Sequence, residues 1–92
     1  MNLARIFASS LRDMKILTDK GLRVGRIYDI IVNENTGKVE TLVLKPESEE
    51  IAKSLKTDED GNALVPFSSV VAVRDYIVVS EKSLAIQKMK GR

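Results

Sequence analysis

The 92-residue sequence contains no cysteine and no histidine. Without cysteine the chain has no disulfide, no thiolate nucleophile and no cysteine-ligated zinc site. Without histidine it lacks the commonest metal ligand and the usual general base at neutral pH. These absences exclude most familiar enzyme chemistries, so we expect a protein with no catalytic residues, no cofactor and no metal.

Long apolar runs are also missing. The longest is about four residues, whereas a membrane-spanning helix needs about 20. Charges at Arg5, Arg12, Asp13 and Lys15 interrupt the charged-then-apolar order of a secretory signal peptide. We therefore expect a cytoplasmic protein that meets a membrane only indirectly.

What is present is the composition of one small globular domain, 43% apolar and 30% charged, with a net charge of +2. The charges are unevenly distributed. Residues 1–26 carry six basic and two acidic groups, residues 27–80 five and ten, and residues 81–92 four and one. Basic ends can attract phosphates or an anionic membrane, but the acidic centre repels both, so we favour solubility and end-to-middle complementarity.

Turn-forming residues separate β-branched, apolar segments along most of the chain, a pattern typical of strands joined by short loops. The turns are Asp19–Gly21, Asn33–Gly37, Asp58–Asn62 and Arg74–Asp75, and the predicted strands are Met14–Thr18, Val24–Val32, Lys38–Lys45, Ala63–Val73 and Tyr76–Ser80. The pattern predicts a mainly β fold, a small antiparallel β-barrel.

One segment, residues 48–56, has a helical pattern instead. It begins with a potential serine cap at Ser48 and places Ile51 and Leu55 four residues apart on one face. We expect a short helix that covers one opening of the barrel. Partner binding through Ile51 and Leu55 is the alternative.

Four predicted strand segments are apolar on both faces, more than a single small barrel can bury. They are Ile30–Val32, Leu42–Leu44, Val70–Val73 and Tyr76–Val79. A second copy of the chain would cover this surface, so we predict a homodimer. The interface candidates are Tyr76, Ile77, Val78, Val79, Leu84 and Ile86. The alternative is that the terminal segments of the same chain cover the strands.

Both ends of the chain have more than one interpretation. Residues 1–14 carry apolar side chains at helical spacing, which suits an amphipathic helix on an anionic membrane, but Ile6 and Phe7 suit a first strand better. Residues 81–92 form a basic tail that could be a docking helix, a dimer arm or a frayed end.

Other binding chemistries find little support. Asp58–Asn62 has its glycine in the wrong place for a calcium loop. Lys45 and Lys53 lie among carboxylates, where surface lysines are usually not catalytic. A pI of about 9.0 suggests nucleic acid, but the four aromatic residues are dispersed through predicted strands, so nucleic-acid binding is not favoured.

Five motifs in order resemble the PRC-barrel family. They are Gly21–Asp29, Asn33–Val39, Leu42–Leu44, Val65–Val70 and Asp75–Val79, and the resemblance runs from about Ile6 to Ser80. It implies a barrel domain over residues 1–80 followed by the tail at 81–92. The matching positions with a structural role are Gly21, Gly25, Asp29, Gly37 and Pro66. Here Gly25 permits close strand packing, and Pro66 bends a strand or places it at an edge.

The length of the chain is similar to that of stand-alone archaeal PRC-barrel proteins associated with FtsZ-based cell division. That resemblance implies a non-enzymatic adaptor that binds SepF, the membrane anchor of FtsZ, and so meets FtsZ indirectly. The alternative is a ribosome- or RNA-associated module, because the same barrel occurs in a ribosome maturation factor.

Overall fold

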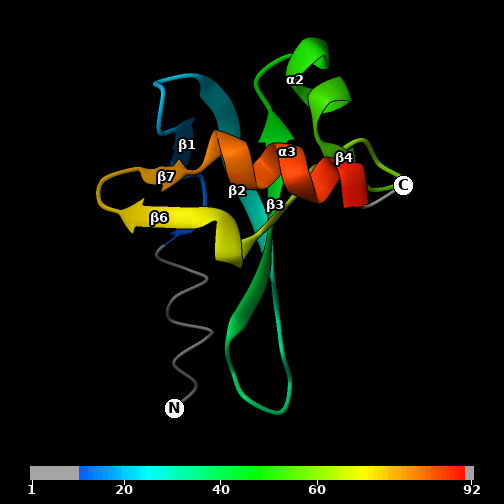
Figure 1. Ribbon diagram of the computed structural model, residues 1–92. Coiled ribbons are helices and arrows are strands. Elements are labelled where there is room, and N and C mark those ends of the chain that lie inside the picture. The colour runs from blue at the N-terminus through cyan, green and yellow to red at the C-terminus, as the bar shows by residue number, and fades with distance from the viewer. Residues whose placement is uncertain (1–10, 91–92) are drawn as a thin grey trace.

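The computed structural model describes residues 11–90, with side chains for residues 11–85. Figure 1 shows strands packed with two helices. In chain order the elements are β1 (Lys15–Thr18), β2 (Arg23–Val32), β3 (Val39–Pro46), α2 (Glu49–Ser54), β4 (Lys56–Thr57), β5 (Ala63–Pro66), the 3-10 turn η1 (Phe67–Ser69), β6 (Val70–Val73), β7 (Ile77–Val79) and α3 (Glu81–Lys90). The prediction of a mainly β, barrel-like fold is confirmed.

The strands form one sheet in the order β4-β5-β3-β2-β1-β7-β6. Neighbouring strands are antiparallel except for β1 and β7, which run parallel with Ile16 opposite Ile77. The sheet is therefore mixed, whereas the sequence predicted antiparallel pairing throughout. The parallel pair joins the first and last strands, and such a pair requires a long connection, here the rest of the domain.

The core lies on one face of this curved sheet. Its members are Leu11, Ile16, Val24, Ile27, Leu42, Leu44, Leu55, Ala63, Val65, Ile77, Val79 and Leu84. Leucine and β-branched residues at alternate strand positions bring their side chains to the same face. The resulting cluster includes side chains from the first described residue to α3.

Gly25 lies at a point of close approach between β2 and β3. A Cβ atom at this position would lie 2.1 Å from the backbone oxygen of Lys45. Gly25 also pairs with Ile16 of β1 on its other side, and with Pro46 of β3. The predicted role of this glycine in close strand packing is therefore visible in the geometry.

The β2–β3 hairpin projects from the body of the molecule (Figure 1). At its tip, Asn33 Oδ1 accepts hydrogen bonds from the amides of Asn35 (2.8 Å) and Thr36 (3.0 Å). Gly37 follows with φ of +73°, and its amide donates to the Asn33 carbonyl. This is the turn that the sequence predicted around Gly37.

The predicted strand Ala63–Val73 is two strands. β5 ends at Pro66, whose φ of −65° leads into η1, and β6 begins on the far side of that turn. Ser69 is buried in the turn with its hydroxyl 3.0 Å from that of Ser83. The single-strand prediction was wrong, because apolar residues lie on both sides of the turn although the strand pairing does not continue through it.

The predicted helix at 48–56 is present as α2. Ser48 caps it by accepting a hydrogen bond from the Ile51 amide at 3.2 Å, and Leu55 after the helix is buried in the core. The helix α3 occupies most of the predicted tail, and its Leu84 is also in the core. Part of the strand surface is thus covered by the chain itself.

Candidate interaction surface

The predicted interface residues are divided between the core and the surface. Ile77 and Val79 are completely buried and Leu84 is 8% exposed, so these three pack inside their own chain and offer no surface to a partner. The physical reason is that β7 lies between β1 and β6 and is not at the edge of the sheet. Tyr76 is 39% exposed and Val78 is half-buried. The side chain of Ile86 lies outside the described part of the structure.

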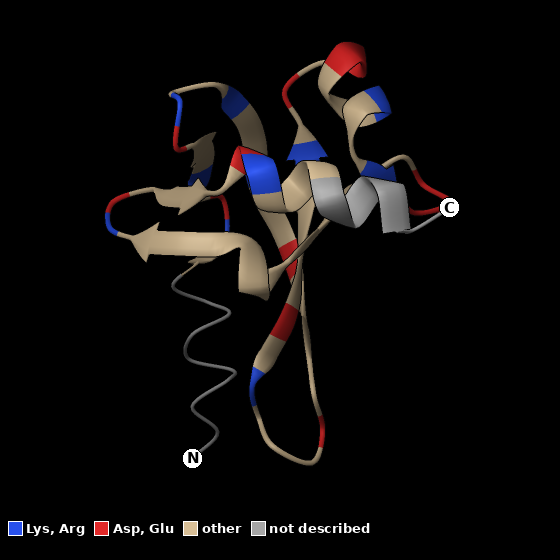
Figure 2. Ribbon diagram, viewed as in Figure 1, with Lys and Arg blue, Asp and Glu red and all other residues tan. Residues whose placement is uncertain are grey.

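The exposed apolar surface lies one strand further out. Val71 is 60% exposed and Val73 is 43% exposed, and both are on β6. The pairing of β6 with β7 shifts register between Val70 and Ala72, so the exposure of these two valines does not follow from simple alternation along the strand, while Val70 packs against the core. We call Val71, Val73 and Tyr76 the β6 edge. Figure 2 shows β6 and β7 without a charged residue, and Arg74 and Asp75 are confined to the turn between them.

The two edges of the sheet differ in how they are protected. β4, at one edge, has only the residues Lys56 and Thr57, both exposed, and short charged edge strands resist pairing with another chain. Among the described residues β6 pairs with β7 alone. The other side of this uncharged strand therefore has no hydrogen-bonded strand beside it among the described residues.

Other exposed apolar side chains are scattered. Leu22 lies in a turn, while Tyr28 and Ile31 are on β2. The Lys45 Nζ lies 4.5 Å from the centre of the Tyr28 ring, a cation–π contact on the outer surface. Isolated exposed apolar residues are normal in soluble domains, so these three carry less weight than the β6 edge.

The acidic turn at Asp58–Asn62 is held by its own hydrogen bonds. Asp58 Oδ1 accepts from the amides of Asp60 and Asn62, both at 2.9 Å, and Oδ2 accepts from the Asn62 side chain at 3.3 Å. Desolvation raises the pKa of Asp58, but these hydrogen bonds and one from Gly61 lower it by more, so its pKa lies below the ordinary value of 3.8. The carboxylate stabilises a turn.

Neither a cluster of metal ligands nor a membrane-spanning helix occurs within residues 11–90. No group of three or more acidic residues in that range is placed to hold a metal ion. The helices of the same range are too short and too polar to cross a membrane. Residues 1–10, which include the first strand favoured at Ile6 and Phe7 and most of the alternative membrane-binding helix, lie outside the described residues, as does Arg92 in the tail.

The structure also contains a pocket that sequence reasoning missed. It lies where the β1–β2 turn, α2 and α3 meet, and its volume is about 250 Å³. We call it the α2–α3 pocket, and it is lined by Thr18, Leu22, Val24, Ile51, Ser54, Leu55, Glu81, Leu84 and Ala85. No local sequence signal predicts it, because its walls come from three segments far apart in the chain.

Comparisons with known proteins agree with this architecture. The sequence model of the PRC-barrel domain matches residues 4–85. An uncharacterized protein of Methanocaldococcus jannaschii is 30% identical over 77 residues, which cover 84% of this chain and 83% of that protein. The family match therefore includes the first half of α3 with its buried Leu84.

Proposed function

The chain belongs to the PRC-barrel domain family, and from this membership and the β6 edge we propose that it is a non-enzymatic, cytoplasmic adaptor that acts as a homodimer. The β6 edge is the observation that supports this proposal. It combines a strand that pairs on one side only among the described residues with two exposed valines and no charge, and a β-bulge between Val70 and Ala72 interrupts its pairing with β7. Such an edge pairs readily with another strand.

We propose an antiparallel contact between β6 strands of two copies. With Ala72 at the centre, Val71 of one copy faces Val73 of the other, and the reverse pair follows by symmetry. Cross-strand pairs of β-branched residues stabilise a sheet. The seam is one strand away from the one expected from sequence, because β7 has neighbours on both sides.

The oligomeric state of the purified chain tests the dimer. We expect a dimer by light scattering at about 100 µM, a concentration suited to weak interfaces, and a monomer for Val71→Lys. Ile31→Lys is the matched control, because it places the same charge at another exposed apolar position, 47% exposed on β2. A monomeric wild type, or equal loss of the dimer in both variants, would contradict the β6 seam.

The specific partner that we propose is SepF, and FtsZ is reached through it. Support comes from the resemblance to stand-alone archaeal PRC-barrel proteins and from the archaeal relative at 30% identity. Calorimetric titration of the wild-type chain with SepF tests this assignment, with affinity expected in the range of tens of micromolar for a transient adaptor. Absence of binding would remove SepF as the partner. Salt-sensitive binding of RNA, lost when Lys88, Lys90 and Arg92 are neutralised, would instead favour the ribosome-associated alternative.

A further inference from the structure

The α2–α3 pocket has the size of one long side chain. Its volume of about 250 Å³ corresponds to roughly eight water molecules at ~30 Å³ each. Pockets for cofactors and other small molecules are usually larger, about 300–1,000 Å³. Most of the wall is apolar and comes from Leu22, Val24, Ile51, Leu55 and Leu84. A group that binds in this pocket must therefore be short and mostly apolar.

One carboxylate is fixed in this apolar wall. The Thr18 hydroxyl donates to Glu81 Oε2 at 2.6 Å, and the same hydroxyl accepts from the amides of Lys20 (3.2 Å) and Leu22 (3.1 Å). Thr18 is 4% exposed. The Glu81 amide donates to Asp19 Oδ1 at 3.2 Å, which holds the first residue of α3 against the β1–β2 turn. The Glu81 carboxylate is thus oriented by the hydrogen bond from Thr18 to its side chain and by the hydrogen bond from its backbone amide to Asp19.

Glu81 has no basic partner in the described part of the chain. The ion pair found there joins Arg23 and Glu47 at 3.9 Å, away from this carboxylate. Glu81 Oε1 accepts no hydrogen bond from the described residues, although Glu81 is only partly exposed. Covering a carboxylate with an apolar group alone is costly, because its hydration is lost without replacement. An occupant of the pocket must therefore bring a positive charge to Oε1.

We propose that the α2–α3 pocket receives an arginine side chain from a partner polypeptide. The alkyl part of the arginine would pack against the leucines and Ile51, and the guanidinium would pair with Glu81 Oε1. Arginine suits the site better than lysine, because its planar guanidinium is more weakly hydrated and loses less on partial burial. The site is separate from the β6 edge, so the proposal goes beyond the dimer and does not depend on it.

Amide chemical-shift mapping on the full chain tests the proposal. The probe is the peptide acetyl-Leu-Arg-Leu-amide, and its control carries citrulline, which has nearly the same shape without the charge. We expect saturable shifts at Leu22, Ile51 and Ala85, and binding of the arginine peptide about tenfold tighter than that of the citrulline peptide. Glu81→Gln should abolish this difference. The glutamine can still accept the hydrogen bond from Thr18, so the fold should be kept.

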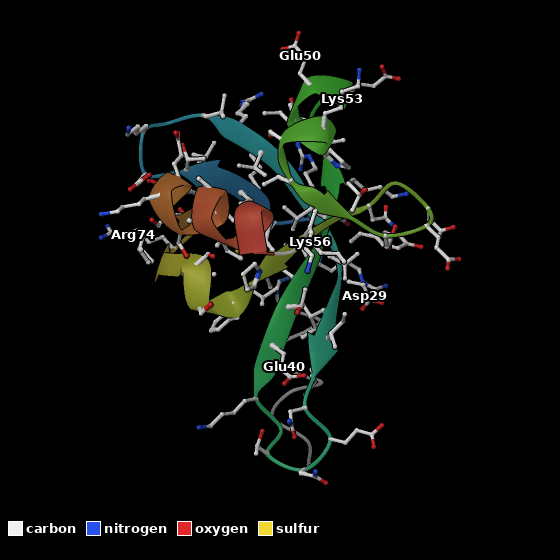
Figure 3. The ribbon with its side chains drawn as sticks, turned by 45° about the vertical axis from the view of Figure 1, so that its right-hand side comes forward. Asp29, Glu40, Glu50, Lys53, Lys56 and Arg74 are labelled. Atoms are coloured by element: carbon white, nitrogen blue, oxygen red, sulfur yellow. The ribbon has the colours of Figure 1, made fainter. Side chains whose placement is uncertain are left out.

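Glu50→Gln is the matched control for charge. It removes the same charge from α2, and Figure 3 shows Glu50 pointing outward from that helix. This variant should bind the arginine peptide as the wild type does. Ala85→Leu, which fills the pocket from α3, should weaken both peptides. The proposal is overturned if the two peptides bind equally, if neither binds at about 10 mM, if the shifts lie elsewhere, or if both glutamate variants weaken binding equally. None of these outcomes depends on the oligomeric state.

Discussion

Substituting Gly25 by alanine probes the contact that brings β2 and β3 together. The added Cβ would lie 2.1 Å from the Lys45 backbone oxygen and 3.1 Å from Pro46 Cα, and real Cβ contacts below 3.0 Å are essentially not found. The obstructing atom is backbone and cannot rotate away. The two strands must therefore separate by about 1 Å at this point, which is a large displacement in a close-packed interior.

That separation weakens the hydrogen bonds around the pairs Gly25↔Pro46 and Arg26↔Lys45. With about 1 kcal/mol for each weakened hydrogen bond and further loss of core packing, we expect destabilisation of about 3–4 kcal/mol. A domain of this size has roughly 5–15 kcal/mol in total. The midpoint of thermal unfolding should fall by about 15 °C or more, and urea titration followed by circular dichroism should give the same free-energy loss.

Gly37→Ala is the control for this prediction. Gly37 has φ of +73°, but no atom lies within 4 Å of the place that an alanine methyl group would take, so its cost is conformational alone, about 1 kcal/mol. If Gly25→Ala destabilised the protein no more than Gly37→Ala, close approach of β2 and β3 would not be the reason for the glycine.

Three further substitutions test other parts of the structure. Ser48→Ala removes the cap of α2 and should cost about 1 kcal/mol in urea unfolding, and no change would show that the cap does not stabilise the helix. Leu84→Ala should cost about 2–4 kcal/mol because this side chain is in the core, whereas a negligible cost would mean that α3 is not part of the folded unit. The lowered pKa of Asp58 contributes stability above its ordinary value of 3.8, and that contribution is lost as pH falls through the lower folded value. Asp58→Asn should therefore lose less stability than the wild type between pH 5 and pH 2, roughly the window in which such carboxylates titrate, and an identical profile would contradict this reasoning.

The local features of the fold could be predicted from the sequence. Turn residues around Gly37 and the apolar, β-branched segments on either side of them predicted the β2–β3 hairpin, and Ser48 followed by helix-forming residues predicted α2. These predictions succeeded because hairpins, caps and short helices depend on interactions between residues a few positions apart. The same reasoning placed one strand at 63–73 where the structure has two, since apolar residues on both sides of Ser68 and Ser69 do not reveal where pairing stops.

The surfaces available to partners were decided by tertiary structure. Pairing of β1 with β7 buries Ile77 and leaves Val71 at the edge, and Thr18 meets Glu81 across 63 positions of sequence. The sequence alone determined that the chain is one small domain, through its composition, and that it is rich in β-strands with apolar residues on both faces, through the order of turns and apolar segments. Which of those residues stay exposed depends on which strand, distant in the sequence, pairs beside them. The local residue pattern does not predict that pairing.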